Sequence, residues 1–180
     1  MTKNNSSLTI REVCLEDAAL LMQWWNDPEI MGHVGLPAGL GLSLADVQKS
    51  IRKGKSGESQ PPSSMLFMVL LGTEKRPIGE LNYSGWDPVR STVAVGIKIC
   101  EIGSRRCGHG RAALGEFLKL LQSRLGVSTV TLDVLARNIP AWRLYEELGF
   151  RLVRRRRDAY HCAETDELLD VLDYCLDVDG

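Results

Sequence analysis

A glycine loop flanked by arginines occupies residues 105–117, with the sequence RRCGHGRAALGEF. Gly108 and Gly110 stand just before an amphipathic run, so the loop is expected to open a helix. A helix N-terminus offers free backbone N–H groups and the positive end of the helix dipole, and glycines let that backbone approach a ligand closely. The spacing predicts a phosphate-binding turn, although a solvated helix start with turn glycines would also fit. Side chains that could add positive charge at its rim are Arg105, Arg106, His109 and Arg111.

Two other kinds of phosphate loop fit this stretch less well. In a P-loop, Gly103 and Gly108 would have the right spacing, but His109 stands where a lysine must reach the phosphates. In a dinucleotide fold, GHGRAA would be the glycine turn and Asp133 the ribose-binding carboxylate. That fold needs a strand that runs straight into the first glycine, and here a further segment separates Cys100 from Gly108. The chain also ends at residue 180, too early for a second nucleotide-binding half.

Length and composition are those of one globular domain. The chain has 180 residues, of which 44% are hydrophobic and 25% charged, and we expect a single domain over 8–180 after a short frayed end at 1–7. Its net charge of −1 argues against nucleic acid as the main partner. No apolar run is long enough to predict a membrane span. The five cysteines form no C-x-x-C pair, so we predict no metal site, and reduced thiols in the cytoplasm.

Hydrophobic periodicity predicts the element order β-α-α-β-β-β-α-β-α-β-β. Pro28 should close the first helix or the turn after it, and the second helix should begin after Ser43 as its N-cap and end before Gly54. Three apolar segments with short connections, 64–72, 76–87 and 91–100, predict an antiparallel meander. The strand after the glycine-loop helix is expected to run parallel to the strand before it. The expected strands outside the meander are 8–13, 127–135, 150–158 and 167–176, and the later helices are 110–125 and 139–149.

Two segments resemble the signatures of one family, the GNAT acyltransferases. RRCGHG is similar to the family's R/Q-x-x-G-x-G/A loop, through Arg105, Gly108 and Gly110. ARNIPAWRLYEELGF, at 136–150, is similar to the second signature, an asparagine followed by a short helix that carries a tyrosine and ends in Gly-Phe. The separation of the segments and the element order also match from residue 8 onward. WWNDPEIM and IGELNY further resemble the RimJ/RimL-like branch, which acylates protein N-termini, polyamines and small amines.

The resemblance implies an α/β (α+β) GNAT fold, with a mixed, mostly antiparallel central sheet flanked by helices. It implies acetyl-CoA as cosubstrate and no metal. The strand 91–100 would diverge, near Ile97 to Cys100, from the strand 129–135, and backbone groups in the gap would bind the pantetheine arm like an added strand. Asn138 would bind that arm too, although it could equally be the N-cap of the helix at Pro140. The implied cofactor-binding residues are Ile97, Lys98, Ile99, Cys100, Arg105, Arg106, Cys107, Gly108, His109, Gly110, Arg111, Asn138, Ala141 and Tyr145.

Tyr145 and Glu80 are the expected catalytic residues. When an amine attacks a thioester a thiolate must leave, and a phenol can protonate or hydrogen-bond its sulfur. The resemblance places the family's tyrosine at Tyr145, although spacing alone would also suit a core tyrosine. The amine must lose a proton, and Glu80 is the first candidate for the base, directly or through water. A solvent-facing strand carboxylate is the alternative for Glu80, and Asp87 and Asp133 are weaker candidates.

The first helix and the loop after it are expected to contact the acceptor. Aromatic and acidic side chains suit a cationic amine through cation–π and ionic contacts. One of Trp24 and Trp25 should be in the core, since both cannot face the same way, and Asp27 could simply make a turn with Pro28. The expected acceptor-binding residues are Trp25, Asn26, Asp27, Glu29 and Tyr83.

The four arginines at 154–157 lie in an expected strand beside an acidic last strand. Cross-strand ion pairs explain this run better than nucleic acid does. The whole pattern predicts an N-acetyltransferase that moves the acetyl group of acetyl-CoA to a primary amine by direct attack in a ternary complex. A non-catalytic acyl-CoA sensor is the alternative. The expected partner is an amine substrate, without nucleic acid or membrane, for a monomer or homodimer.

Overall fold

A computed structural model describes residues 7–55 and 61–178, which form one mixed sheet flanked by helices. The strand order is β1-β2-β3-β4-β5-β7-β6, and every neighbouring pair is antiparallel except β4 and β5. The frayed end predicted for 1–7 lies, apart from Ser7, outside the described residues. The strands are β1 Leu8–Glu12, β2 Met65–Leu71, β3 Arg76–Asp87, β4 Thr92–Ile99, β5 Thr129–Leu135, β6 Arg151–Cys162 and β7 Glu167–Asp177. The helices are η1 Leu15–Asp17, α1 Ala18–Asn26, α2 Pro28–Met31, η2 Gly32–Val34, α3 Leu44–Lys55, η3 Ile102–Ser104, α4 His109–Leu125 and α5 Ile139–Glu147.

The predicted meander and the predicted parallel pair are both confirmed, and the differences lie at helix ends. Helix α1 ends at Asn26 and Asp27 follows as its C-cap, so the chain turns just before Pro28, as expected. Pro28 is also the first residue of α2, and the Asp27 side chain caps that helix by accepting the Glu29 N–H at 2.8 Å. Ser43 does cap α3, since its hydroxyl accepts the Asp46 N–H. Gly54 lies inside α3 rather than after it.

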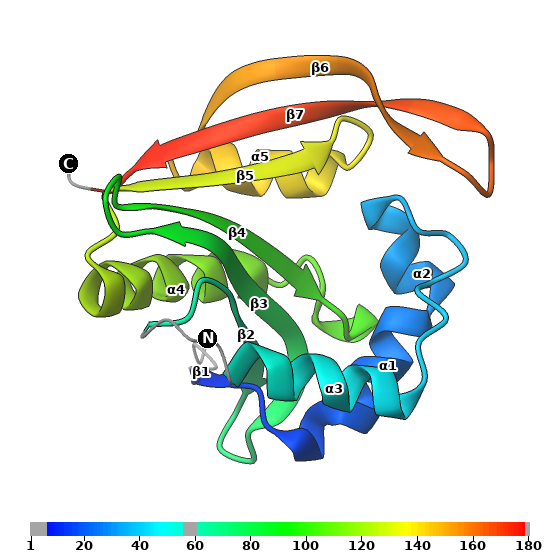
Figure 1. Cartoon of the computed structure of the whole chain (residues 1–180), viewed down its shortest axis with the longest axis vertical. Coiled ribbons are helices and arrows are strands. Elements are labelled where there is room, and N and C mark those ends of the chain that lie inside the picture. The colour runs from blue at the N-terminus through cyan, green and yellow to red at the C-terminus, as the bar shows by residue number, and fades with distance from the viewer. Residues whose placement is uncertain (1–6, 56–60, 179–180) are drawn as a thin grey trace, which may run out of the picture.

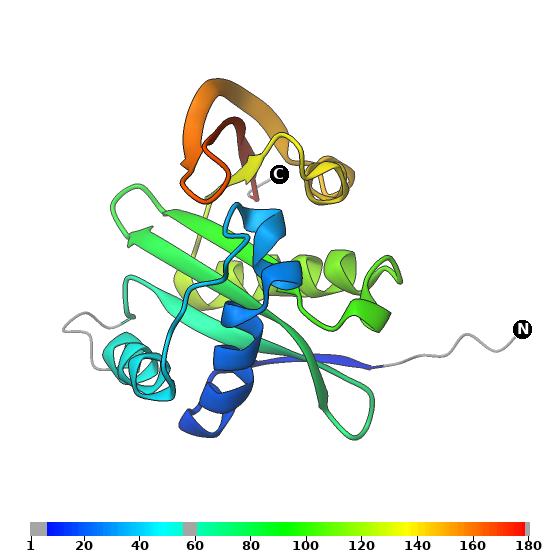
Figure 2. The ribbon, with the colours of Figure 1, turned by 90° about the vertical axis from the view of Figure 1, so that its right-hand side faces the viewer.

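Two hydrophobic layers sandwich the sheet. Strand side chains alternate between faces, so Phe67 and Leu81 pack on α4 and α5, while Met68 and Leu70 pack on α1 and α3. Figure 2 shows α4 and α5 on one side of the sheet and the N-terminal helices on the other. Side chains that the sequence places on opposite strand faces are therefore separated by the sheet itself.

The parallel junction between β4 and β5 is short. Their register covers Thr92–Ala94 against Thr129–Thr131, and beyond it β4 continues to pair with β3 alone while β5 pairs with β7. The two strands lie together near the C-terminus of the chain and diverge toward α2 (Figure 1). The predicted divergence of the strand 91–100 from the strand 129–135 is confirmed, and it divides the sheet into two halves.

The arginine run of β6 forms the cross-strand ion pairs that the sequence predicts. Arg154 and Arg156 both contact Asp173, at 3.1 and 2.8 Å, and Arg155 contacts Asp170 at 2.6 Å. These pairs are largely exposed and each contributes little stability, but they neutralise an edge strand that is otherwise strongly basic.

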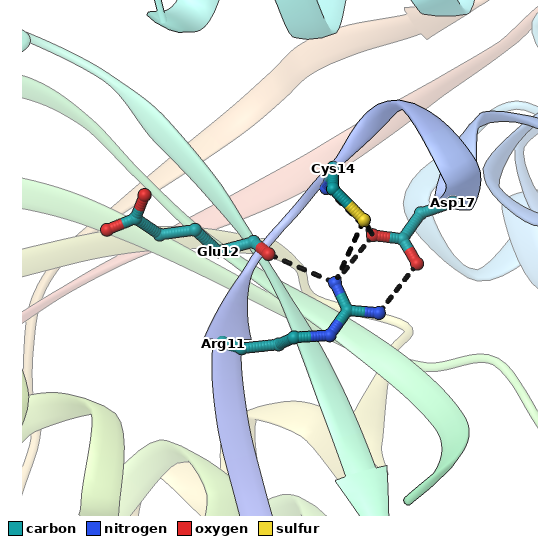
Figure 3. A network of polar contacts seen from close by, with 4 residues as sticks. All are labelled: Arg11, Glu12, Cys14 and Asp17. Atoms are coloured by element: carbon teal, nitrogen blue, oxygen red, sulfur yellow. Dashed lines mark hydrogen bonds and ion pairs between the residues drawn. The ribbon is translucent and has the colours of Figure 1, made fainter.

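A polar network joins the end of β1 to the start of the first helix (Figure 3). Both terminal nitrogens of Arg11 donate to the Asp17 carboxylate, at 2.7 and 2.8 Å, and the Cys14 N–H donates to the same group at 2.8 Å. Burial alone would raise the pKa of Asp17, but these donors outweigh it and hold that pKa below its ordinary value. The network fixes the angle at which α1 leaves the sheet.

Replacing Asp17 by Asn is expected to lower the free energy of unfolding by about 1–3 kcal/mol at neutral pH, because charge-assisted hydrogen bonds to a buried group are lost. The folded-state pKa is depressed, so this stabilisation is present above the ordinary value of 3.8 and is lost as pH falls through the folded value. Urea denaturation of both chains at several pH values checks this. An equal stability gap at neutral and strongly acidic pH would contradict it.

Candidate functional site

The site is built on the edge of β4 that faces the other half of the sheet. From Val95 to Ile99, β4 has no pairing with β5, so the backbone on this edge has no strand partner in the described chain. Arg105 Nε donates to the Ile99 carbonyl at 2.9 Å, so the last carbonyl of β4 already has a side-chain donor. The arrangement leaves an extended backbone that can hydrogen-bond a linear ligand.

The predicted phosphate turn follows β4 after η3 and lies at the start of α4. Gly108 is the N-cap residue with φ +80°, and no side chain caps the helix there. The amides at the start of α4 are therefore not consumed by a side-chain cap. A Cβ on Gly108 would meet nothing within 4 Å, so its glycine is required by backbone conformation and leaves the space over the helix end open.

Gly110 also has a packing reason to be glycine. A Cβ there would lie 3.1 Å from Leu144 Cδ1 and 3.6 Å from Ile99 Cγ1. The residue therefore lets α4 pack closely against α5 and the end of β4. Gly110 therefore brings the two signature segments together. Tyr145, the residue after Leu144 on α5, is placed near the end of β4 by this packing.

Charged and polar side chains lie in and beside the turn. Arg111 is exposed and its guanidinium lies 3.8 Å from Glu147 of α5. Arg106 is exposed, with a backbone φ of +58° that is unusual for a non-glycine residue, and Cys107 is exposed beside it. His109 is half-buried. These groups can contact a phosphate only from the solvent side of the turn.

Tyr145 is 6% exposed and lies in an aromatic cluster, with ring centroids 5.9 Å from Phe150 and 6.2 Å from Tyr174. Burial raises its pKa to about 12, and the negative charge of Asp133 adds to this. No described residue hydrogen-bonds its hydroxyl, yet no buried side-chain polar atom of the described residues lacks a partner, so the phenolic oxygen reaches the surface. It is a protonated donor with nothing to donate to within the described chain.

Asn138 and Ala141 lie at the start of α5. Asn138 occupies the N-cap position, but its side chain makes no capping bond and donates instead to the His33 carbonyl at 3.2 Å. Its carbonyl oxygen remains available as an acceptor. Ala141 is half-buried and packs against the core.

A buried polar cluster lies on the opposite face of β3 and β4, under α1 and α2. The Glu80 side chain is 2% exposed; it accepts from the Trp25 indole N–H at 2.8 Å and lies 2.6 Å from Lys98 Nζ. Lys98 Nζ also lies 3.6 Å from Met31 Sδ. Glu80 is therefore not a solvent-facing strand carboxylate, because α1 covers it. Buried Cys100 lies nearby, and burial raises the pKa of its thiol, with the charge of Glu80 adding to the effect.

The expected acceptor residues separate into different environments. Trp24 is the core tryptophan, at 4% exposed, while Trp25 bonds Glu80. The Asn26 amide binds both backbone groups of Leu42, at 2.8 and 2.9 Å, so it clasps the loop before α3. Tyr83 lies on the α4 face of the sheet and donates to the Pro62 carbonyl at 3.0 Å.

Asp27 and Glu29 complete that set. Asp27 caps α2 as described above, and Glu29 is exposed in the first turn of that helix. The structure thus brings Trp25, Asp27 and Glu29 to one region at the α1–α2 junction. Tyr83 lies on the other side of the sheet from them.

Sequence reasoning missed the side chain of Lys98, which was expected to contribute only backbone. The signal was available in principle, since Glu80 and Lys98 are directly opposite in the β3–β4 register. That register includes an irregularity between Ser84 and Asp87, which cannot be counted from the sequence. The pairing therefore emerges only from the folded hairpin.

None of the helices in the described residues is both long and apolar enough to cross a membrane. In the same part of the chain, no three His, Cys, Asp or Glu side chains are grouped so that they could hold a metal ion.

Comparison with known proteins agrees with this geometry. A family profile described as Acetyltransferase (GNAT) domain matches residues 7–151. An uncharacterized N-acetyltransferase, p20, from Bacillus licheniformis is 25% identical over 171 residues, covering 94% of this chain and 92% of that protein. The spermidine N-acetyltransferase from Vibrio cholerae in complex with CoA and spermine superposes with a TM-score of 0.82 at 19% identity, covering 94% of each chain. A dodecameric structure of spermidine N-acetyltransferase from Vibrio cholerae gives 0.77 at 19% identity, covering 94% and 93%.

The family profile and the shared fold agree with each other. The family profile spans most of the chain and includes both signature segments up to residue 151. This chain belongs to the GNAT acetyltransferases, which use acetyl-CoA as cosubstrate.

Proposed function

We propose that this chain transfers the acetyl group of acetyl-CoA to a primary amine, which attacks the thioester directly in a ternary complex. The observation that carries the proposal is the unpaired edge of β4 between an uncapped helix N-terminus and the free phenol of Tyr145. The helix end suits the diphosphate of CoA, and the strand edge suits the amide groups of its pantetheine arm. A CoA molecule bound along the β4 edge in this way would have its thioester directed toward the α1–α2 junction, where the expected acceptor-binding residues lie.

The residues of the chain can assist both bond changes of the transfer. As the amine nitrogen bonds to the acetyl carbon, negative charge develops on the carbonyl oxygen, and a free N–H of the β4 edge can stabilise it. As the carbon–sulfur bond breaks, the thiolate receives a hydrogen bond from Tyr145. With a pKa of about 12, Tyr145 stays a neutral donor at physiological pH. Complete proton transfer to a thiolate of pKa about 8.5 is uphill, so hydrogen bonding is its main contribution.

Two carboxylates could receive the proton that the acceptor ammonium loses. Glu80 is our first choice. Both of its oxygens already have donors, so the side chain of Lys98 or Trp25 must move away before a water molecule can reach it. Asp133 is more open, with a 72% exposed side chain 4.0 Å from Arg156, and its charge acts on Tyr145. We expect Glu80→Gln, rather than Asp133→Asn, to lower the turnover of the amine at neutral pH, measured as thiol release.

The acceptor is proposed to be a cationic amine. Asp27 and Glu29 project at the α1–α2 junction beside Trp25, and Asp133 lies on the exposed face of β5. Each of these carboxylates would attract an ammonium group. The Vibrio cholerae structure with spermine supports polyamines as the first class to test, and the RimJ/RimL-like branch would add peptide N-termini.

Assembly and location remain predictions. We keep monomer or homodimer as the proposed state, to be checked by light scattering, because the Vibrio cholerae neighbour described as dodecameric shares the fold at only 19% identity. A cytoplasmic location is supported by the absence of any cystine among the five cysteines, all of which are free thiols in the described chain.

The proposal is tested by mixing the purified chain with acetyl-CoA and a panel of amines. Spermidine, an aminoglycoside and a short peptide with a free N-terminus cover the main chemical classes. Thiol release and the mass of the product are recorded together. We expect at least one amine to give equal amounts of free thiol and acetylated product. CoA binding without turnover on any amine would instead favour the non-catalytic sensor.

A further inference from the structure

The segment that follows α2 is hydrogen-bonded by residues of β6 and the start of α5, although the helices before it pack on the other half of the sheet. It follows α1 and α2, which pack on β2–β4, yet the Tyr160 hydroxyl of β6 donates to the Gly35 carbonyl at 2.8 Å. Asn138, at the start of α5, donates to the His33 carbonyl at 3.2 Å. We refer to residues 32–35 as the bridging segment, because these contacts cross the line along which β4 and β5 diverge (Figures 1 and 2).

The contact between Tyr160 and Gly35 is closely fitted. Gly35 is buried and has φ +93°, and a Cβ at this position would lie 2.6 Å from Tyr160 Cε1. Both the backbone conformation and the aromatic ring therefore exclude a larger residue. Burial, and secondarily the nearby Cys162 and Glu164, raise the pKa of Tyr160, so its hydroxyl remains a donor at neutral pH.

Backbone hydrogen bonds join the bridging segment to α2, which carries an expected acceptor-binding residue. The Gly35 N–H bonds the Gly32 carbonyl and the Leu36 N–H bonds the Met31 carbonyl, so the segment continues α2 without a flexible joint. Met31 in turn contacts Lys98, the partner of Glu80. A displacement of Gly35 would therefore be transmitted to α2, which carries Glu29 and is capped by Asp27.

We propose that Tyr160 is a positioning residue for the acceptor amine. By holding the bridging segment, it fixes α2 relative to β6. It thereby sets the position of Asp27 and Glu29, the expected acceptor-binding residues at the start of α2. This inference rests on the proposed acetyl transfer. It assigns this role to one hydroxyl, that of Tyr160, acting through its hydrogen bond to the Gly35 carbonyl.

The test compares Tyr160→Phe with the wild-type chain and with His161→Gln. Phenylalanine keeps the ring over Gly35 and removes only the hydroxyl. His161 is the next residue of β6, is exposed, and pairs outward with Asp166, so its variant controls for general effects on the hairpin. Kinetics are measured with the best amine of the panel above, CoA affinity by calorimetry, and backbone mobility by hydrogen–deuterium exchange of peptides covering residues 32–40.

For Tyr160→Phe we expect the KM for the amine to rise about five- to tenfold, as for one lost neutral hydrogen bond, with kcat and CoA affinity within twofold of wild type. Exchange in residues 32–40 should become faster, and His161→Gln should change none of these. Unchanged exchange, or a loss of CoA affinity equal to the rise in KM, would overturn the inference. If the wild-type chain acetylates no amine, the proposed function fails, and the exchange result alone still decides whether Tyr160 holds the segment.

Discussion

Replacing Tyr145 by Phe should lower kcat about 10- to 100-fold, while the Kd for acetyl-CoA changes less than threefold. The loss corresponds to one hydrogen bond to a developing thiolate, which is stronger than a bond between neutral groups. Because the pKa of Tyr145 is about 12, the hydroxyl is a donor throughout the neutral range, and the ratio of wild-type to variant kcat should be constant between pH about 6 and 10. Steady-state thiol release over this range measures it.

Tyr174 offers the matched control for this variant. It belongs to the same aromatic cluster, with its ring centroid 6.2 Å from that of Tyr145, but its hydroxyl donates to Glu146 at 2.9 Å. Tyr174→Phe removes an equivalent hydroxyl that already has an internal partner, so we expect a small stability loss and kcat within twofold of wild type. Equal kcat losses in the two variants would assign the effect to packing and would remove Tyr145 from the chemistry.

Replacing Lys98 by Met should destabilise the fold by about 3 kcal/mol, because it leaves the Glu80 carboxylate buried with only the Trp25 N–H as a donor. Lys98 is 21% exposed and Glu80 only 2%, so most of the cost falls on Glu80. Chemical denaturation at neutral pH measures the change, and acceptor turnover should fall with it, since Trp25 and α2 rest on this cluster.

A double-mutant cycle separates the pair from its surroundings. Glu80→Gln in the Lys98→Met background removes the uncompensated charge, so the double variant should recover at least about 1 kcal/mol relative to Lys98→Met alone. Its fold would then be restored while its turnover remains low, because the carboxylate is absent. Additive stability losses would show that the two side chains do not interact as the 2.6 Å contact indicates.

Much of the scaffold could be predicted because local signals agree with the final packing. The alternation of β2, β3 and β4 and their short connections specify a meander, and Gly108 marks the turn that opens α4. The aspartates of β7 account for the arginines of β6 from the sequence alone, and the ion pairs confirm it. Each of these features depends on residues that are neighbours in sequence or in one strand pair.

The site could be predicted only where a family signature marks it. Tyr145 and Asn138 are found through their motif, but the engagement of Glu80 by Trp25 and Lys98 depends on how α1 crosses the sheet. The Tyr160–Gly35 contact joins residues 125 positions apart, and no periodicity in either segment predicts it. Long-range side-chain pairing is set by tertiary packing, which local sequence patterns do not encode.

Binding of CoA at the start of α4 is tested by a calorimetric titration of the purified chain with CoA, using Gly108→Val as the comparison. We expect one CoA per chain for the wild type. We expect at least tenfold weaker binding for the variant, because valine strongly disfavours the φ of +80° that leaves the start of α4 open. No heat with wild type, or equal affinity in a folded Gly108→Val chain, would contradict binding of the coenzyme at this turn, and the amine chemistry built on it.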